Sequence, residues 1–276
     1  MLVAQDGKIL LDLVITLCYY ILMLPLFKSH FSIGKSILTL DLPSKCSEHG
    51  SDSVFKIAED NNFKEVILVE DSFNGFLQAK KNAEELDMKL IFGIRFLIAE
   101  DIDEKLSRDN NNKHRIIIFA KNDEGIKSLY KIYNRAFAKG FGHLNYKFLK
   151  ESWNENLKIA VPFYDSFLFA NLISFSNCVP DFTFCDPTFF IEKNNLPFDF
   201  VVEPAVKKYC KENKLKTQLV KTIYYKKRED AKAFQTYKCL CSRSFGRQST
   251  LEEPNLNHFG SNEFCIESWK QQDESK

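Results

Sequence analysis

The residues most capable of chemistry stand at the ends of short apolar runs. In a domain of parallel strands and helices, such ends meet at one edge, where active sites form. A hydrolytic metal site needs several His, Asp or Glu ligands there, and only His30, Glu70 and Asp71 qualify. Two adjacent carboxylates in one strand point to opposite faces, so Glu70 and Asp71 are not a ligand pair. The other groups at these ends are Lys28, Ser29, Ser72, Arg95, Thr222 and Tyr224. The sequence indicates an enzyme-like scaffold without an enzyme-like set of groups.

Other catalytic and binding motifs do not occur in the sequence. It has no GxGxxG, Walker A, GxSxG or HExxH pattern. The five histidines are scattered, and Cys239-x-Cys241, the only close pair among eight cysteines, does not face one way on a helix. We interpret the cysteines as free thiols of a reducing cytosol. Basic clusters at 207–208, 226–228 and 243–247 are interpreted as solvated surface.

Composition and charge limit the classes of function. The chain of 276 residues is 45% hydrophobic, which excludes a disordered or disulfide-scaffold protein. Lys plus Arg is 38 and Asp plus Glu is 37, so the formal net charge is +1. No global basic field exists to hold nucleic acid, and any DNA contact must be local or shared with a partner.

The elements that must position these groups alternate from Pro25 to about residue 241. We predict helices beginning near 54, 75, 122, 165, 203 and 228, and a solvated loop at 100–113. The chain loses periodicity after 242 and becomes a polar tail after Trp269. Six or more strands alternating with helices imply parallel βαβ units in one α/β domain, with a barrel as one arrangement. The predicted strands are 65–70, 89–98, 115–120, 158–161, 188–192, 198–202 and 216–225.

The order of these segments resembles the PHP (polymerase and histidinol phosphatase) domain that opens the alpha subunit of bacterial DNA polymerase III. The most specific piece is AKNDEG at 120–125, which is similar to the family's LLLAKNEEGYKNL. The resemblance covers about residues 23–269. It implies a single-domain, distorted (β/α)7 barrel in residues 23–241, and then an extension at 242–276 that leads toward a missing polymerase palm. The other matching segments are 26–36 with HxHSxYSLLDG, 66–75 with a strand ending in TDHGN, 88–95 with IKPIIGCE, and 253–268 with DP and FYLKS.

The family's metal-ligand positions are changed in this sequence. Under the resemblance they fall on Leu26, Lys28, Asp71, Ser72, Arg95, Thr222 and Tyr224, of which Asp71 alone keeps a ligand. An alternative placement of the first motif on 39–44 would retain one acid, Asp41, but matches fewer neighbours. Because fixed cations repel divalent metals, we expect no metal cofactor and an ion pair between Asp71 and Lys28 or Arg95. Lys28 and Arg95 could also contact a phosphate, although we prefer drift after loss of activity.

The resemblance implies a free-standing, metal-free module of a C-family replicative DNA polymerase, not catalytic alone. We expect it to be a scaffold for a separate polymerase chain in DNA replication, and to reach DNA through that complex. A split or truncated polymerase, with a virus as one origin, would supply such a chain. The alternative is a metal-dependent phosphoesterase or 3′–5′ proofreading exonuclease with a site rebuilt around Asp71 and Glu70.

The apolar stretch at 9–27 leaves three interpretations: a membrane span, a signal peptide, or upstream sequence read in frame. A balanced charge before it, the lack of an A-x-A site and Pro25 within it disfavour the first two. Residues 23–27 also take the place of the family's first strand, and the family is cytosolic. We therefore predict that Met23 is the natural initiator, that 1–22 is an upstream extension or unstructured apolar segment, and that the protein is cytoplasmic with no membrane contact.

Overall fold

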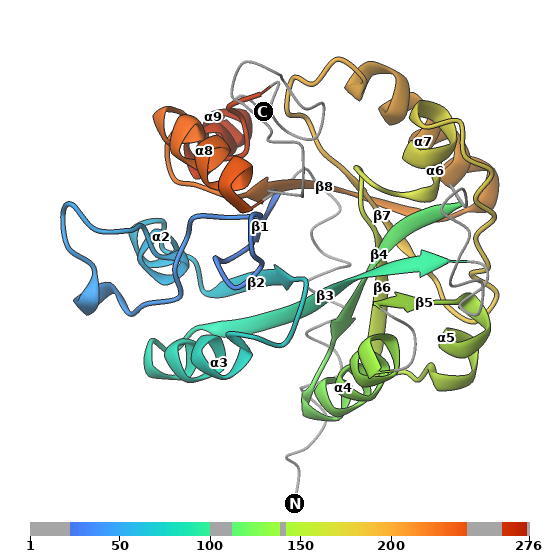
Figure 1. Cartoon of the computed structure of the whole chain (residues 1–276), viewed down its shortest axis with the longest axis horizontal. Coiled ribbons are helices and arrows are strands. Elements are labelled where there is room, and N and C mark those ends of the chain that lie inside the picture. Colours follow the sequence, from blue (N-terminus) through green and yellow to red (C-terminus); the bar gives the residue numbers. More distant parts are fainter. Residues whose placement is uncertain (1–22, 100–111, 139–141, 242–260, 275–276) are drawn as a thin grey trace, which may run out of the picture.

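Seven strands close into a barrel in the computed structural model, which describes residues 23–99, 112–138, 142–241 and 261–274 (Figure 1). Each strand pairs with the next in the order β1-β8-β7-β6-β4-β3-β2, and β2 pairs with β1 to complete the ring. The short strand β5 (His143–Leu144) adds to the outer edge of β3. The barrel strands are β1 (Leu24–Phe27), β2 (Glu65–Glu70), β3 (Lys89–Ala99), β4 (Lys113–Ala120), β6 (Leu157–Val161), β7 (Thr188–Ile191) and β8 (Lys216–Ile223). The prediction of a seven-stranded α/β barrel is confirmed.

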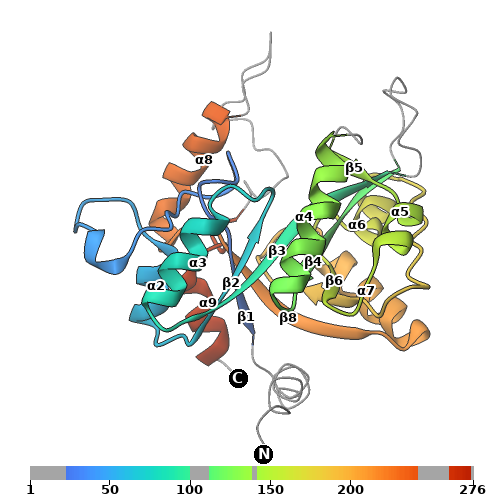
Figure 2. The same cartoon turned by 90° about the horizontal axis from the view of Figure 1, so that it is seen from below.

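Helices surround the strands on the outside of the ring (Figures 1 and 2). Short 3-10 turns at Pro43–Lys45 and Arg228–Asp230 precede α2 and α8 respectively. No helix in the described part of the chain is long and apolar enough to cross a membrane. The helices are α2 (Val54–Asp60), α3 (Phe76–Glu85), α4 (Asp123–Ala138), α5 (Tyr146–Ser152), α6 (Phe167–Ile173), α7 (Asp199–Asn213), α8 (Ala231–Cys241) and α9 (Ile266–Glu274).

The apolar strands are buried on both faces, which explains their unbroken hydrophobic runs. In β2, Ile67 and Val69 belong to the cluster that fills the barrel, whereas Val66 and Leu68 pack in the layer beneath the helices. This alternation follows from the two-residue period of a strand. The interior cluster comprises Leu26, Ile67, Val69, Ile117, Phe119, Ala160, Phe190 and Val220. The barrel is therefore a packed core rather than a pore.

The prediction of parallel strands throughout is wrong for β4. It runs antiparallel to both of its neighbours, β3 and β6. Parallel neighbours need a crossover, usually a helix, and the charged and Asn-rich sequence at 100–112 lacks helical periodicity. Those residues lie almost wholly outside the described part of the chain. The reversal brings the start of β4 to the same end of the barrel as the ends of the parallel strands.

Two further predictions of local structure need correction. Residues 198–202 are not a strand, because α7 begins at Asp199. The carboxylate of Asp199 accepts hydrogen bonds from Asn194 N at 3.0 Å and Leu196 N at 3.1 Å, and so holds the turn that starts the helix. The polar tail predicted after Trp269 is helical, since α9 continues to Glu274.

The end of the chain packs back onto its start. Trp269 Nε1 donates a 2.6 Å hydrogen bond to Met23 O, and its ring meets Phe63 edge to face. Phe264 and Cys265 are fully buried, and the backbone of Cys265 pairs with that of Tyr225 in an isolated parallel β-bridge. The segment 261–274 thus belongs to the barrel's outer layer. The predictions for residues 1–22 and for the segment 242–260, including Glu253-Pro254, fall outside the described residues.

Candidate functional site

Charged side chains meet at the end of the barrel where the parallel strands finish. Lys28 directly follows β1, Asp71 directly follows β2, and Arg95 lies in the second half of β3. Asp165 lies a few residues after β6. Arg115 is near the start of β4 and reaches this end only because β4 is antiparallel. Five segments that are remote in sequence therefore supply one cluster.

These residues form a continuous chain of ion pairs. Lys28 Nζ lies 2.9 Å from Asp71 Oδ1, and Arg95 Nε approaches the same oxygen at 3.4 Å. Arg95 Nη1 is 3.5 Å from Asp165 Oδ2, and Arg115 Nε is 3.9 Å from it. The side chains of Lys28 and Arg95 are only 3% and 9% exposed. The cluster thus holds buried cations close together.

Burial and neighbouring charge set the protonation of the cluster. Burial alone would raise the pKa of Asp71, but the charges of Lys28 and Arg95 outweigh it and hold that pKa well below its usual range. Burial lowers the pKa of Lys28, and Asp71 offsets only part of the shift. For Arg95, Asp71 and Asp165 outweigh burial and raise the pKa. Asp71 is consequently ionised throughout the neutral range.

Glu70 faces a different set of partners from Asp71. Its carboxylate accepts hydrogen bonds from Ser29 N at 2.8 Å and from the Ser32 hydroxyl. Ser32 Oγ in turn accepts a 2.9 Å bond from Asp71 N. Burial raises the pKa of Glu70, even though Lys28 and these bonds favour the ionised form. Glu70 therefore ties the segment after β1 to the end of β2.

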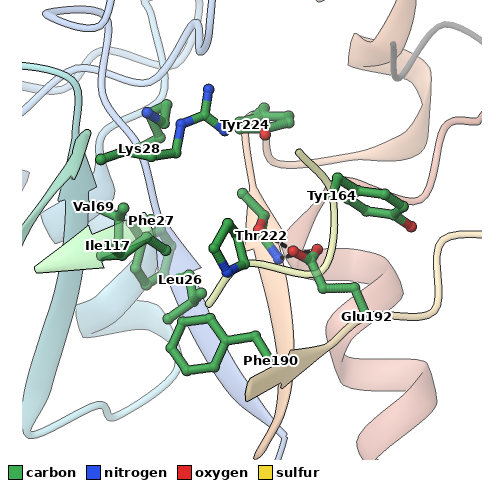
Figure 3. A pocket seen from close by; sticks show the side chains of 12 residues that line it. Leu26, Phe27, Lys28, Val69, Ile117, Tyr164, Phe190, Glu192, Thr222 and Tyr224 are labelled. Atoms are coloured by element: carbon green, nitrogen blue, oxygen red, sulfur yellow. Dashed lines mark hydrogen bonds between the residues drawn. The ribbon is translucent and has the colours of Figure 1, made fainter. Parts of the chain in front are cut away.

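The predicted ligand positions mostly line one cavity of about 30 Å³ (Figure 3). Lys28 and Tyr224 lie at one end of it and Phe190 at the other. Such a volume holds a water molecule or two. The predicted positions lining it are Leu26, Lys28, Arg95, Thr222 and Tyr224. Asp71 joins them through its ion pairs, whereas Ser72 does not line the cavity and accepts a bond from Asn74 N.

Neither His30 nor Asp41 joins the charged cluster through a hydrogen bond or ion pair in the described part of the chain. His30 Nδ1 lies 3.3 Å from Leu38 O, and its ring packs on Phe31. Asp41 accepts a bond from Gln78 on α3. The placement of the first motif on 39–44 therefore puts its acid beside α3, while the first strand of the barrel ends at Phe27, directly before Lys28.

Several residues at this end of the barrel were not predicted from the sequence as members of the site. Glu192 directly follows β7 and accepts bonds from Thr222 Oγ1 at 2.9 Å and Asn194 Nδ2 at 3.0 Å. Glu192 is the last residue of the predicted strand 188–192, and Asp165 follows the predicted strand 158–161, so the rule that located Glu70 and Asp71 could have found them. Arg115 was missed because its strand was assigned the opposite direction. Lys35 and Lys238 come from a loop and a helix, whose positions strand patterns do not reveal.

The donor set around Asp71 does not fit a divalent cation. Metal sites of this kind need several imidazole, carboxylate or thiolate ligands, and Asp71 is contacted by an ammonium and a guanidinium instead. Within the described residues, no group of three or more His, Cys, Asp and Glu side chains is arranged to hold a metal ion. The geometry instead suits ion pairing and contact with anions.

Comparison with protein-family models matches residues 39–180 to the PHP domain, just over half of the chain. The chain belongs to the PHP domain family. No curated protein matches it significantly. The matched region of the PHP domain includes β2, β3, β4 and β6, and hence Asp71, Arg95, Arg115 and Asp165.

The AKNDEG run of this PHP domain serves the fold rather than the charged cluster. Asn122 Oδ1 accepts a 2.8 Å bond from Gly125 N, and Lys121 N donates to Asn156 O. A Cβ at Gly125 would lie 2.4 Å from Asn156 O, so the close approach of α4 to this loop requires glycine. The motif therefore fixes how β4 turns into α4.

Proposed function

We propose that this PHP domain is a metal-free module of a C-family replicative DNA polymerase and acts as a scaffold for a separate polymerase chain. The observation that carries the proposal is the pairing of Asp71 with Lys28 and Arg95. Two fixed cations occupy positions where the resemblance would place metal ligands, and both contact the one carboxylate that remains. An ion at that point would face direct repulsion. We therefore propose that the domain is not catalytic by itself.

The polymerase assignment draws support from the AKNDEG run. Its residues resemble the polymerase branch of the family, and the contacts of Gly125 and Asn122 give this run a structural role in the turn from β4 to α4. The alternative of a phosphoesterase or exonuclease draws no support from Glu70 and Asp71. Glu70 is bound to Ser29 and Ser32, and Asp71 to two cations.

The scaffold role draws support from exposed apolar side chains on α6, the segment after it and the first turn of α7. Phe175 is 91% exposed and Phe200 is 76% exposed, and Leu172, Val179 and Val201 are exposed as well. Helices α6 and α7 contact each other, and large apolar side chains left exposed on neighbouring elements are typical of surfaces that become buried against another protein. We expect the partner polymerase chain to cover this surface.

Two measurements on the full chain test the proposed function. Elemental analysis of the purified protein should find less than one Zn, Mn or Fe per chain, and phosphate esters and DNA should remain intact. Two or more metals per chain, or nuclease activity lost in Asp71→Ala, would overturn the metal-free assignment. Binding to the polymerase chain encoded in the same genome should weaken in Phe200→Ser but not in the control Leu77→Ser, an exposed leucine on α3. Equal binding of all three proteins would refute the predicted surface.

A further inference from the structure

We propose that the charged end of the barrel is a binding site for a phosphate-sized oxyanion, held by Lys28, Arg95 and Arg115 together with Lys35 and Lys238. This goes beyond the scaffold role and does not depend on a polymerase partner. It shares with the proposed function only the assignment of a metal-free barrel end.

The first step of the argument is the excess of positive charge. The described residues of the cluster include five cations and two carboxylates, Asp71 and Asp165. Glu70 and Glu192 also lie near it, but their carboxylates accept bonds from other groups, namely Ser29, Ser32, Thr222 and Asn194. Even with all four acids ionised, the cations outnumber them. Buried charge of one sign is costly unless an opposite charge offsets it.

The second step places Lys35 and Lys238 over the same end. The loop that carries Lys35 is held to β2 by the Ser32–Glu70 bond and touches α8, since a Cβ at Gly34 would lie 3.0 Å from Cys241 Cβ. Helix α8 packs on the end of β8 through Phe234, which stacks on Tyr224 at 5.3 Å. Lys238 lies one turn after Phe234 on this buried face.

Mutual effects on protonation agree with this placement. Burial, and next Arg95, lower the pKa of Lys35. Burial, and next Lys35, lower the pKa of Lys238 to about 8. Burial and Arg95 also lower the pKa of Arg115. An anion among these groups would relieve their repulsion.

The third step is unused hydrogen-bonding capacity. Arg95 Nε is buried and has no properly aligned hydrogen-bond acceptor in the described part of the chain, although Asp71 lies nearby. Arg115 reaches Asp165 only at 3.9 Å, and Lys35 makes no ion pair with any described residue. Two guanidinium groups and an ammonium with free donors match a tetrahedral oxyanion better than a carboxylate or a halide. The cavity of about 30 Å³ is too small for the ion, so the ion would bind outside the cavity, beside the charged cluster.

Calorimetric titration and thermal unfolding of the full chain test the site, with inorganic phosphate as the probe. Sodium chloride at equal ionic strength is the reference, and a deoxynucleoside monophosphate forms a second arm. Phosphate should bind with one site per chain and raise Tm. Binding of the monophosphate without binding of inorganic phosphate would identify a nucleotide as the source of the phosphoryl group. Binding of both probes with equal affinity would identify the free phosphate ion as the ligand.

Variants decide whether the named residues carry the binding. Arg115→Gln and Lys35→Met should each weaken phosphate binding about tenfold, the value of one charge-assisted hydrogen bond. Lys207→Met, an exposed lysine on α7, should leave binding unchanged and serves as the matched control. Asp165→Asn should tighten binding several-fold, because it removes a competing negative charge. Asn also tolerates the positive φ of 63° at this position.

The outcomes separate this proposal from the proposed function. Failure of both inorganic phosphate and the deoxynucleoside monophosphate to bind at millimolar concentration would overturn the oxyanion site, and so would equal weakening by Lys207→Met and Arg115→Gln. Unchanged or weaker binding in Asp165→Asn would do the same. Two or more metals per chain would overturn the metal-free barrel end that both proposals share, whereas failure to bind a polymerase would overturn the scaffold role alone and leave the oxyanion site intact.

Discussion

Among the described residues, Asp71 is the only carboxylate that forms ion pairs with both Lys28 and Arg95, and its replacement by asparagine removes this charge while keeping the shape of the side chain. Breaking a buried ion pair by removing one partner costs about 3–5 kcal/mol, because an uncompensated charge remains. Asp71 is 30% exposed, so water screens part of this effect. We expect a loss of about 3 kcal/mol in the free energy of unfolding, which lowers Tm by about 6–12 °C in a domain of this size.

Urea unfolding followed by circular dichroism measures this loss, and a double-mutant cycle assigns it. Asp71→Asn combined with Lys28→Met should be less destabilised than the sum of the single variants by about 1–3 kcal/mol, because the buried cation goes with its partner. Asp123→Asn is the matched control, since Asp123 pairs with Lys80 at 3.1 Å but is 82% exposed. It should cost less than about 0.5 kcal/mol.

The dependence on pH gives an independent reading of the same pair. The pKa of Asp71 is lowered in the folded state, so its ionised form adds stability above the usual aspartate pKa. That contribution is lost as the pH falls below this value, and the difference between wild type and Asp71→Asn should shrink in acid. If Asp71→Asn unfolds like wild type at neutral pH, or if the cycle shows no coupling, the assignment of Asp71 as a buried ion-pair partner is refuted.

Three other perturbations test separate parts of the fold. His114 is 4% exposed and burial lowers its pKa from 6.5 to about 4, so stability should fall by about 2 kcal/mol between pH 6.5 and pH 5, as the unfolded state gains a proton. His114→Gln should flatten that part of the urea-unfolding pH profile, and an unchanged profile would contradict the shift. Gly125→Ala places a Cβ 2.4 Å from Asn156 O, and we expect the free energy of unfolding, measured by thermal unfolding, to fall by about 2–4 kcal/mol. An unchanged stability would show that the loop around Asn156 can move to accommodate the methyl group. Trp269→Phe keeps an aromatic ring but removes the indole N–H and its hydrogen bond to Met23 O. The free energy of unfolding should fall by about 1–2 kcal/mol in the same assay, and a stability equal to wild type would refute this.

Much of the local structure follows from the sequence because apolar runs are a strong signal. The run at 65–70 forms β2 with the predicted bounds, since both faces of the strand are buried and its four central residues are apolar. The order of the strands also places Lys28 and Asp71, which follow strands, and Arg95, which lies in the second half of one, at the same edge, because parallel strands end together. These inferences need only the period of a strand and the direction of the chain.

Tertiary structure decided which other groups share that edge. The direction of β4 depends on its pairing with β3 and β6, and no residue within 113–120 specifies it. Arg115 therefore lay, by sequence reasoning, at the opposite end of the barrel from Asp165. The segment 198–202 has strand-like residues, yet hydrogen bonds to Asp199 make it the start of a helix.

The sign of the charge at the barrel end belongs to the fold as a whole. The sequence has nearly equal numbers of acidic and basic residues, so its composition does not predict a site for an anion. A loop fastened by Glu70 and a helix packed through Phe234 bring Lys35 and Lys238 to the three cations of the strands. Sequence by itself determined where strands and their terminal side chains lie. Only long-range packing determined how many positive charges meet there, because that number depends on contacts between segments that are remote in the chain.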